Sequence, residues 1–278
     1  MSMGKISQQI KKFIPRRIGY TLRRLKLWYG RMRYRGNNFY CPVCEHGYRF
    51  FFDGGFDLPV ISEMEIVGAG KRPNAICPGC SSNDRDRLVL LALKNQKYNF
   101  LPADKLLHIA PEPSLATWLG NYQMKHHGQY IKSVKYHEGF YYGNDVHLID
   151  LLQLPFKSDT FNLVICNHVL EHIPDDVAAM KEILRVLAKG GQAILQVPWS
   201  MKLDETFEDP NIKSIGDREK FFGQFDHVRL YGRDFPSRLR SVGFDIKVLS
   251  VNDLDLNKDT ITSLGLNSKE LIFVARKA

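Results

Sequence analysis

Apolar and polar positions in residues 104–278 repeat with two different periods. Helix-like stripes, in which apolar residues recur every three or four positions, occur at 114–119, 177–187 and 235–242. Strand-like runs lie around them, at 105–110, 130–136, 146–150, 161–166, 192–197, 244–251 and 270–276. This alternation predicts an α/β fold with a mostly parallel sheet, in which Pro174 opens the second helix and Gly190-Gly191 closes it. In such open sheets, ligands bind beyond the carboxyl ends of the strands.

Composition is that of a folded globular chain. The 278 residues are 44% apolar and 25% charged, which excludes disordered and fibrous classes. No stretch of 18 uncharged apolar residues occurs, so the sequence predicts no membrane-spanning helix. Five cysteines are too few for a disulfide-stapled miniprotein, and we expect a cytoplasmic protein.

The first 38 residues form a predicted basic amphipathic helical arm. Residues 1–40 hold eleven Lys and Arg and no Asp or Glu, so the net charge of +9 lies in this arm. Three interpretations remain open, of which the first is favoured: the apolar stripe docks on the chain's own body, it lies on the anionic inner face of a membrane through residues 1–36, or the arm contacts nucleic acid. The stripe consists of Ile18, Leu22, Leu25, Tyr29 and Met32.

Two Cys-x-x-Cys pairs follow the arm, at Cys41/Cys44 and Cys77/Cys80. Each pair is a tight turn that directs two thiolates at one point, and two such turns complete a tetrahedral sulfur shell for structural Zn²⁺. Strand-like residues between the pairs predict a zinc ribbon. The fifth cysteine, Cys166, lies in a buried strand pattern and is predicted to be a small core residue.

These patterns divide the chain into three predicted parts. Residues 1–38 are the arm, residues 39–84 are the zinc ribbon, and residues 85–278 are a Rossmann-like domain. The run SSNDRDR at 81–87 precedes an apolar stretch and predicts a capped helix that leads from the ribbon into the domain.

Four consecutive motifs carry a family resemblance. The segments DLLQLPF (150–156), DTFNLVIC (159–166), NHVLEHIPD (167–175) and ILRVLAKGG (183–191) resemble the middle motifs of class I S-adenosylmethionine-dependent methyltransferases, in particular the small-molecule "type 11" kind. The resemblance implies a seven-stranded sheet whose last strand inserts antiparallel, with S-adenosylmethionine bound over the first two strands. More narrowly, the zinc ribbon, LLHIAPEP (106–113) and GQFDHVRLYG (223–232) are similar to bacterial methyltransferases associated with surface-polysaccharide assembly.

The resemblance also implies where the cofactor binds. The family's glycine-rich first loop is replaced here by a loop with Pro111 and Pro113, and the acid that usually ends the second strand is replaced by Val134 or Lys135. A carboxylate in the first loop would still face the methionine ammonium, and an acid after the third strand would face adenine. The expected cofactor-binding residues are His108, Ala110, Glu112, Glu138, Asp150, Leu151, Asn167 and His168.

Methyl transfer to a hydroxyl needs a base with a pKa near neutrality, and histidine supplies one. We expect His168 and His227 to be catalytic, although His168 suits a cofactor-wall role equally well. Tyr141, His227 and Arg229 are predicted to bind the acceptor, with Arg229 facing an anionic group. For His172, packing within its loop is the favoured interpretation.

Three functions compete. The first is a small-molecule or glycan O-methyltransferase, with an acceptor that carries an anionic group. The second, an RNA base methyltransferase, is disfavoured because Asn167-His168-Val169-Leu170 stands where such enzymes carry Asn/Asp-Pro-Pro-aromatic. The third is a non-catalytic binding protein of the same fold, motivated by the altered first loop.

Overall fold

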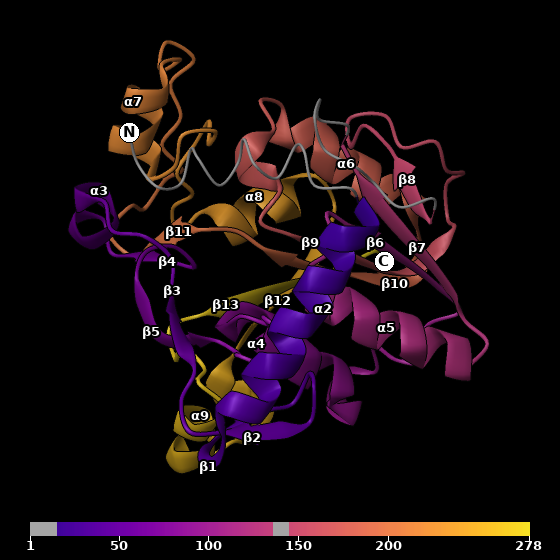
Figure 1. The fold of residues 1–278 in the computed structure, drawn as a ribbon. Helices are drawn as coiled ribbons and strands as arrows, with labels where there is room; N and C mark the ends of the chain where they lie inside the picture. Colours follow the sequence, from indigo (N-terminus) through magenta and orange to yellow (C-terminus); the bar gives the residue numbers. More distant parts are fainter. Residues whose placement is uncertain (1–15, 136–144) are drawn as a thin grey trace.

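The computed structural model describes residues 16–135 and 145–278, and its centre is a seven-stranded sheet within those residues (Figure 1). The strand order is β12-β13-β10-β9-β6-β7-β8. Neighbours from β8 to β10 pair in parallel, whereas β13 is antiparallel to both β10 and β12. This topology confirms the predicted mostly parallel sheet with an antiparallel last strand. The strands are β6 (Lys105–Ile109), β7 (Gln129–Val134), β8 (Val146–Leu148), β9 (Phe161–Asn167), β10 (Leu187–Gln196), β12 (Asp245–Ser250) and β13 (Leu271–Arg276).

Helices cover both faces of the sheet (Figure 1). On one face lie α4 (Asp84–Lys94) and α5 (Pro113–Lys125), and on the other lie α6 (Asp176–Val186) and α8 (Phe235–Ser241). Successive strand residues serve opposite faces: Leu106 packs with the first pair of helices and Leu107 with the second. Cys166 is fully buried in the second cluster, as predicted.

The prediction that Gly190-Gly191 closes helix α6 is wrong. Asp175 caps the helix by accepting a hydrogen bond from the Ala178 amide at 2.9 Å, but the helix ends at Val186 and not at the glycine pair. Strand β10 begins immediately at Leu187, and Gly190-Gly191 lie within it, where its pairing with β9 shifts register. The two glycines therefore belong to a strand irregularity, a use of glycine that a helix-stop pattern does not distinguish.

Residues 35–83, here called the amino-terminal module, contain short antiparallel pairs of strands. Strand β1 (Arg35–Cys41) pairs with β2 (His46–Tyr48), and β3 (Phe52–Gly54) pairs with β5 (Arg72–Ile76). Helix α3 (Pro59–Glu63) and strand β4 (Ile66–Val67) follow β3 along the chain. β1 already begins at Arg35, within the segment expected to be arm.

The module shares its core with the domain. Tyr48 and Phe51 pack in the same buried cluster as Leu88 and Leu90 of α4. Arg87 of α4 is fully buried and donates hydrogen bonds to four backbone carbonyls, those of Asn74, Ser82, Leu264 and Gly265, the last two just after α9 (Lys258–Ser263). The module is therefore fastened to the domain by buried contacts on two sides.

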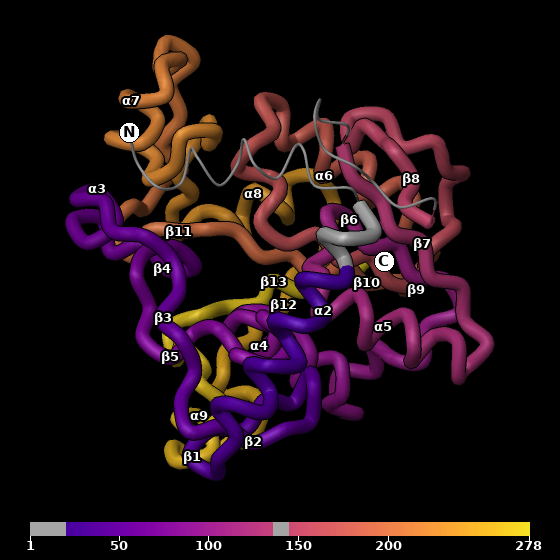
Figure 2. The backbone as a smooth tube through the Cα atoms, in the orientation of Figure 1, coloured from indigo at the N-terminus to yellow at the C-terminus, as the bar shows by residue number. Residues whose placement is uncertain are grey.

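A segment between β10 and α8, here called the insert (199–234), completes the link. Its strand β11 (Trp199–Ser200) pairs with β4, and its helix α7 (Ile215–Phe222) lies near α3 (Figure 2). A separate apolar cluster joins the two segments through Val60, Ile61, Ile66, Phe222 and Leu230.

Helix α2 (Arg16–Arg33) forms most of the described part of the arm. It contacts the second cysteine turn at Gly30, where an added Cβ would lie 2.2 Å from the Pro78 carbonyl oxygen. Docking of the predicted stripe on the chain's own body is not seen for its described side chains, which are all more than half exposed: Leu22 51%, Leu25 54%, Tyr29 56% and Met32 59%. Within the described residues, no helix has the length and apolar character needed to cross a membrane.

Candidate functional site

The four cysteines predicted to bind zinc converge on one point. Cys41 and Cys80 Sγ lie 3.6 Å apart, Cys44 and Cys77 Sγ lie 3.8 Å apart, and all four sulfurs lie within 4.8 Å of one another. A tetrahedral site with Zn–S bonds of about 2.3 Å requires sulfur–sulfur distances of roughly 3.8 Å. All four are free thiols and not disulfides. The donor set and its spacing therefore fit a structural Zn²⁺ ion.

Close packing shapes the second cysteine turn. The Tyr48 hydroxyl lies 3.3 Å from Cys44 Sγ, and a Cβ on Gly79 would lie only 1.8 Å from that hydroxyl oxygen. Only glycine fits at this position. The Ser82 hydroxyl lies 3.2 Å from the sulfurs of both Cys41 and Cys80, so it can donate to a thiolate.

Three of the predicted cofactor residues form one hydrogen-bonded chain at the carboxyl ends of β6 and β9. His108, fully buried on β6, donates from Nε2 to Glu112 Oε2 at 2.8 Å, and its Nδ1 lies 2.9 Å from the Tyr130 hydroxyl. Asn167 ends β9 and donates from Nδ2 to Glu112 Oε1 at 3.2 Å. Strands β7 and β9 flank β6 on opposite sides, so this chain lies at the topological switch point of the sheet.

The negative charge beside His108 and Asn167 belongs to the Glu112 carboxylate. Burial raises the pKa of this carboxyl, but the hydrogen bond and charge of His108 outweigh burial and hold the pKa below its ordinary value. Asp86 of α4 accepts a hydrogen bond from the Ser114 hydroxyl at 3.0 Å, and burial together with the Glu112 charge raises the pKa of Asp86 to about 7. At neutral pH the fully ionised carboxylate is therefore Glu112, whose side chain is 20% exposed.

Asn167 keeps one polar atom free. Its Oδ1 is buried and has no hydrogen-bond partner among the described residues. A buried acceptor without a donor is costly, and it lies on the side chain that also bonds Glu112. Together the two groups offer hydrogen-bond acceptors and negative charge to a cationic ligand group.

The other predicted cofactor residues lie in loops after neighbouring strands. Ala110 follows β6 with a left-handed φ of 50°, and its amide donates to the Ser133 carbonyl of β7 at 2.7 Å. Asp150 follows β8 and is exposed, with Oδ1 accepting from the Leu152 amide at 3.0 Å, while Leu151 is buried in the core. Glu138 and Tyr141 lie outside the described residues.

His168 is the first residue of the loop after β9 and has a left-handed φ of 53°. Its Nδ1 lies 3.0 Å from Arg85 Nη1 and 3.5 Å from Glu171 Oε1, and its Nε2 is buried with no partner among the described residues. Burial, with the positive charge of Arg85 beside it, holds the pKa of His168 well below its usual range. The imidazole is therefore neutral at physiological pH.

Two further histidines meet beside this loop. The rings of His172 and His227 lie edge to face, with centroids 4.8 Å apart. Burial lowers the pKa of His172, but Asp226, at 3.3 Å from Nδ1, more than compensates and raises it. Burial and the neighbouring His172 charge lower the pKa of His227 to about 4. The structure thus brings His227, predicted to be catalytic, next to a histidine that the sequence assigned to loop packing.

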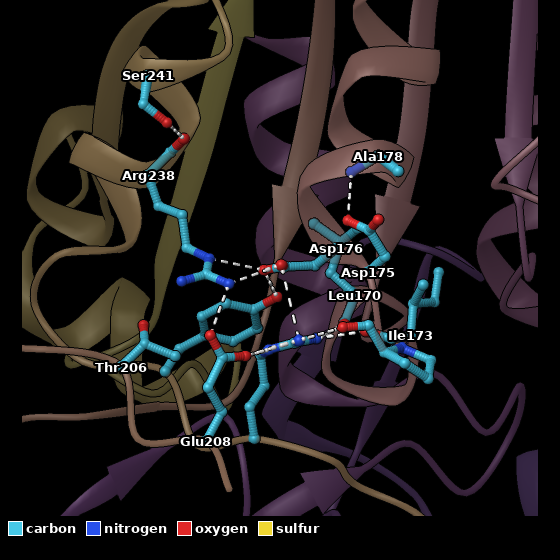
Figure 3. Close-up of polar contacts among 12 residues, drawn as sticks. Leu170, Ile173, Asp175, Asp176, Ala178, Thr206, Glu208, Arg238 and Ser241 are labelled. Carbon is cyan, nitrogen blue, oxygen red and sulfur yellow. Dashed lines mark hydrogen bonds and ion pairs between the residues drawn. The ribbon is translucent and has the colours of Figure 1, made fainter. Parts of the chain in front are cut away.

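Arg229 has different surroundings from those expected of an acceptor-binding residue. It is 2% exposed and forms ion pairs with Glu208 at 2.8 Å and Asp176 at 3.7 Å. Arg238 of α8 holds the same two carboxylates, as Figure 3 shows. The guanidinium of Arg229 also donates hydrogen bonds to the loop after β9, at the carbonyls of Leu170, Ile173 and Pro174. Arg229 therefore joins the insert to that loop, and its guanidinium nitrogens are engaged by groups of the protein itself.

The sequence did not predict that two further residues, Arg85 and Asp86, lie in the site. The sequence predicts Arg85 and Asp86 only as part of a helix start, and Asp86 does complete a capping box with Asn83. Yet Arg85 also reaches His168, 83 residues later in the chain, and Asp86 reaches Ser114. The only available signal was the unusual density of charge in NDRDR (83–87), just before an apolar helix.

Comparison with known proteins supports part of this picture. A family model described as "Methyltransferase domain" matches residues 126–195, about a quarter of the chain. An uncharacterized protein of Methanocaldococcus jannaschii, MJ0638, is 42% identical over 62 residues (22% of this chain, 27% of the relative). The demethylmenaquinone methyltransferase of Staphylococcus haemolyticus is 38% identical over 53 residues (18% of this chain, 22% of the relative). The matched segment supports a methyltransferase domain. The chain spans about a quarter of the length of these relatives.

Solved structures show likeness at low identity. A methyltransferase-like protein from Bacillus halodurans is 17% identical, with 68% of this chain and 98% of that chain covered and a TM-score of 0.41. An S-adenosylmethionine-dependent methyltransferase from Archaeoglobus fulgidus is 14% identical, with 69% and 94% covered and a TM-score of 0.42. The fold assignment rests on the strand order described above.

Proposed function

We propose that the protein transfers a methyl group from S-adenosylmethionine to a hydroxyl of a small-molecule or glycan acceptor. The observation that carries the proposal is the Glu112–Asn167 pair at the switch point, within a domain whose residues 126–195 match a methyltransferase model. An ionised carboxylate beside an unpartnered amide oxygen suits the ammonium of the cofactor's methionine part. Asp150, exposed after β8, would face the adenine amine with its free carboxylate oxygen.

The residues of the chain then have to position the acceptor and take its proton. S-adenosylmethionine, when bound, supplies an electrophilic methyl group on a sulfonium. His168 and His227 are both neutral at physiological pH and so can each accept a proton. Their lowered pKa values make them weak bases, because proton acceptance is most effective near neutrality. Positioning of the acceptor oxygen would therefore contribute more than base strength.

Calorimetry with S-adenosylhomocysteine tests the proposed cofactor site. We expect Glu112→Gln and Asn167→Ala each to weaken binding about tenfold or more, because each removes a group that faces the ammonium; tenfold corresponds to about 1.4 kcal/mol. Glu205→Gln, which changes an exposed carboxylate of the insert, is the matched control and should bind as the parent does.

Thermal melting of each variant separates lost binding from lost folding. If the folded parent protein shows no binding at millimolar ligand, the enzymatic proposal is wrong and a non-catalytic role of the same fold takes its place.

We also propose that the arm contacts an anionic membrane surface. The support is the exposed apolar stripe of α2 together with the eleven positive charges of residues 1–40. An apolar face flanked by Lys and Arg is the pattern of a helix that lies in a lipid interface.

Flotation with liposomes tests this contact. The full chain should float with vesicles that contain phosphatidylserine and much less with neutral vesicles, and the triple change Leu22→Glu, Leu25→Glu and Met32→Glu should abolish flotation. Ile215→Glu, at a residue that is 65% exposed on α7, is the control and should float normally. Equal flotation of the triple variant and the parent would contradict the proposal.

A further inference from the structure

Three potential metal ligands converge between the loop after β9 and the insert. Glu171 and His172 belong to a short 3₁₀ turn (Leu170–His172), and His227 comes from the insert, 55 residues later. One ligand atom from each of the three lies within 4.8 Å of the other two, and His172 Nε2 lies 3.9 Å from Glu171 Oε1. This cluster uses none of the four cysteines.

In both histidines, an oxygen atom near Nδ1 orients the imidazole ring. His172 Nδ1 lies 3.3 Å from Asp226 Oδ2, and Asp226 is itself held by Gln224 Nε2 at 2.8 Å from its other oxygen. His227 Nδ1 lies 3.3 Å from the carbonyl oxygen of Phe222. In each ring the Nδ1–H is thereby engaged by an oxygen acceptor, which leaves Nε2 as the lone-pair nitrogen. This arrangement, with a carboxylate or carbonyl behind the ring, is typical of histidines that bind metal ions.

Glu171 supplies the oxygen ligand. The residue is 2% exposed, and its Oε2 is buried without a hydrogen-bond partner among the described residues. Its other oxygen faces the histidines, 3.5 Å from His168 Nδ1 and 3.9 Å from His172 Nε2. A buried carboxylate with an unpaired oxygen is costly unless a cation or donor completes it.

We propose that Glu171, His172 and His227 bind one divalent transition-metal ion, of the Zn²⁺, Mn²⁺ or Fe²⁺ class, in a second site separate from the four cysteines. Two imidazoles and one carboxylate suit these ions, whereas Mg²⁺ and Ca²⁺ prefer ligand sets made of oxygen atoms. Three protein ligands leave coordination positions open, which distinguishes this site from the closed cysteine site.

The open positions indicate what the ion would do, and this step rests on the proposed function. His168 Nδ1 lies 3.5 Å from Glu171 Oε1, and His168 directly follows Asn167 at the end of β9, so the ion would lie close to the proposed cofactor site. A cation there would stabilise the negative charge that develops on an acceptor hydroxyl as its proton leaves. With His227 bound to the ion, His168 would remain as the residue that accepts the proton. The substrate class is accordingly an acceptor whose hydroxyl loses its proton on transfer.

Metal analysis of the purified full chain tests the site without reference to activity. After equilibration with Zn²⁺ and removal of free ion, the parent should hold two equivalents per chain. His172→Gln and His227→Gln should each hold one. Asp226→Asn, which alters only the group behind His172, should keep the second ion with about 10–100-fold lower affinity. His147→Gln, at an exposed histidine of β8, is the matched control and should hold two equivalents.

If His227→Gln does not fold, His172→Gln still tests the site. The His172 side chain is 29% exposed, so replacing it disturbs the core less. One equivalent in the parent, or two in a folded His172→Gln protein, would overturn the proposal. Calorimetry with S-adenosylhomocysteine on the same samples keeps the two proposals apart. Normal ligand binding with a single ion rejects the second metal site alone, and two ions without ligand binding reject the methyltransferase alone.

Discussion

Arg229→Met should lower the free energy of unfolding by about 3–5 kcal/mol, because removing one partner of a buried ion pair strands the other charges. Arg229 is 2% exposed and satisfies Glu208 and Asp176 together with carbonyls of the loop after β9. Without the guanidinium, those carbonyls and part of the carboxylate charge lose their donors inside the protein. Urea denaturation followed by far-UV circular dichroism measures the change.

Arg233→Met is the matched control for this prediction. Arg233 lies four residues further along the insert and pairs with Asp204, but both side chains are mostly exposed, at 60% and 85%. Exposed pairs contribute about 0–1 kcal/mol, so the control should barely move the transition. If Arg229→Met is as stable as this control, the structural role assigned to Arg229 is wrong, and its expected contact with an anionic acceptor regains support.

Cys77→Ser should have the larger effect, with loss of the bound zinc equivalent and unfolding of the amino-terminal module. Structural zinc contributes roughly 10–16 kcal/mol of apparent binding free energy in small domains, comparable with the ~5–15 kcal/mol that stabilises a typical domain. The strands around the cysteines have only two to seven residues each and cannot replace that contribution. Zinc content by mass spectrometry and trypsin cleavage at Arg35, Arg49 and Lys71 measure the two outcomes.

Cys166→Ala is the control, since Cys166 is equally buried but lies in the sheet, away from the four thiols. It should retain zinc and resist trypsin, with a loss of stability of about 1 kcal/mol. A Cys77→Ser protein that keeps its zinc and its resistance to trypsin would show that the cysteines do not hold a structural ion.

Patterns local in sequence predicted much of this molecule. The strands of the sheet follow from apolar runs, and the antiparallel insertion of β13 was expected from the resemblance of the motifs in residues 145–200. The four cysteines converge as their spacing required, because each turn places two sulfurs together whatever else the chain does. Boundaries were less accurate, as at Gly190-Gly191, where the same residue pair suits a helix end and a strand irregularity.

Contacts between distant segments could not be predicted. Arg229 and His227 lie two residues apart in the insert, and nothing in the pattern separates a buried structural arginine from one that faces a ligand. His108 and Glu112 suit a ligand contact individually, yet they bond to each other only because β6 and α5 are joined by a tight turn. The arm illustrates the reverse case: its stripe is evident from the sequence, but whether a surface exists to cover it depends on the rest of the fold.

The pairing of β4 with β11 has a consequence for how the chain is made. The two strands are separated by more than 130 residues, so a ribosome has synthesised most of the sheet before the partner of β4 emerges. During that interval Ile66 and Val67 remain unpaired, and closing so long a loop is a slow, late event. The cysteine turns can assemble early, whereas the edge of the module beside His168 acquires its final shape only afterwards. A truncated chain that begins at residue 85 would leave β11 without its partner permanently, so a shortened version would be a poor substitute for the whole protein in functional assays.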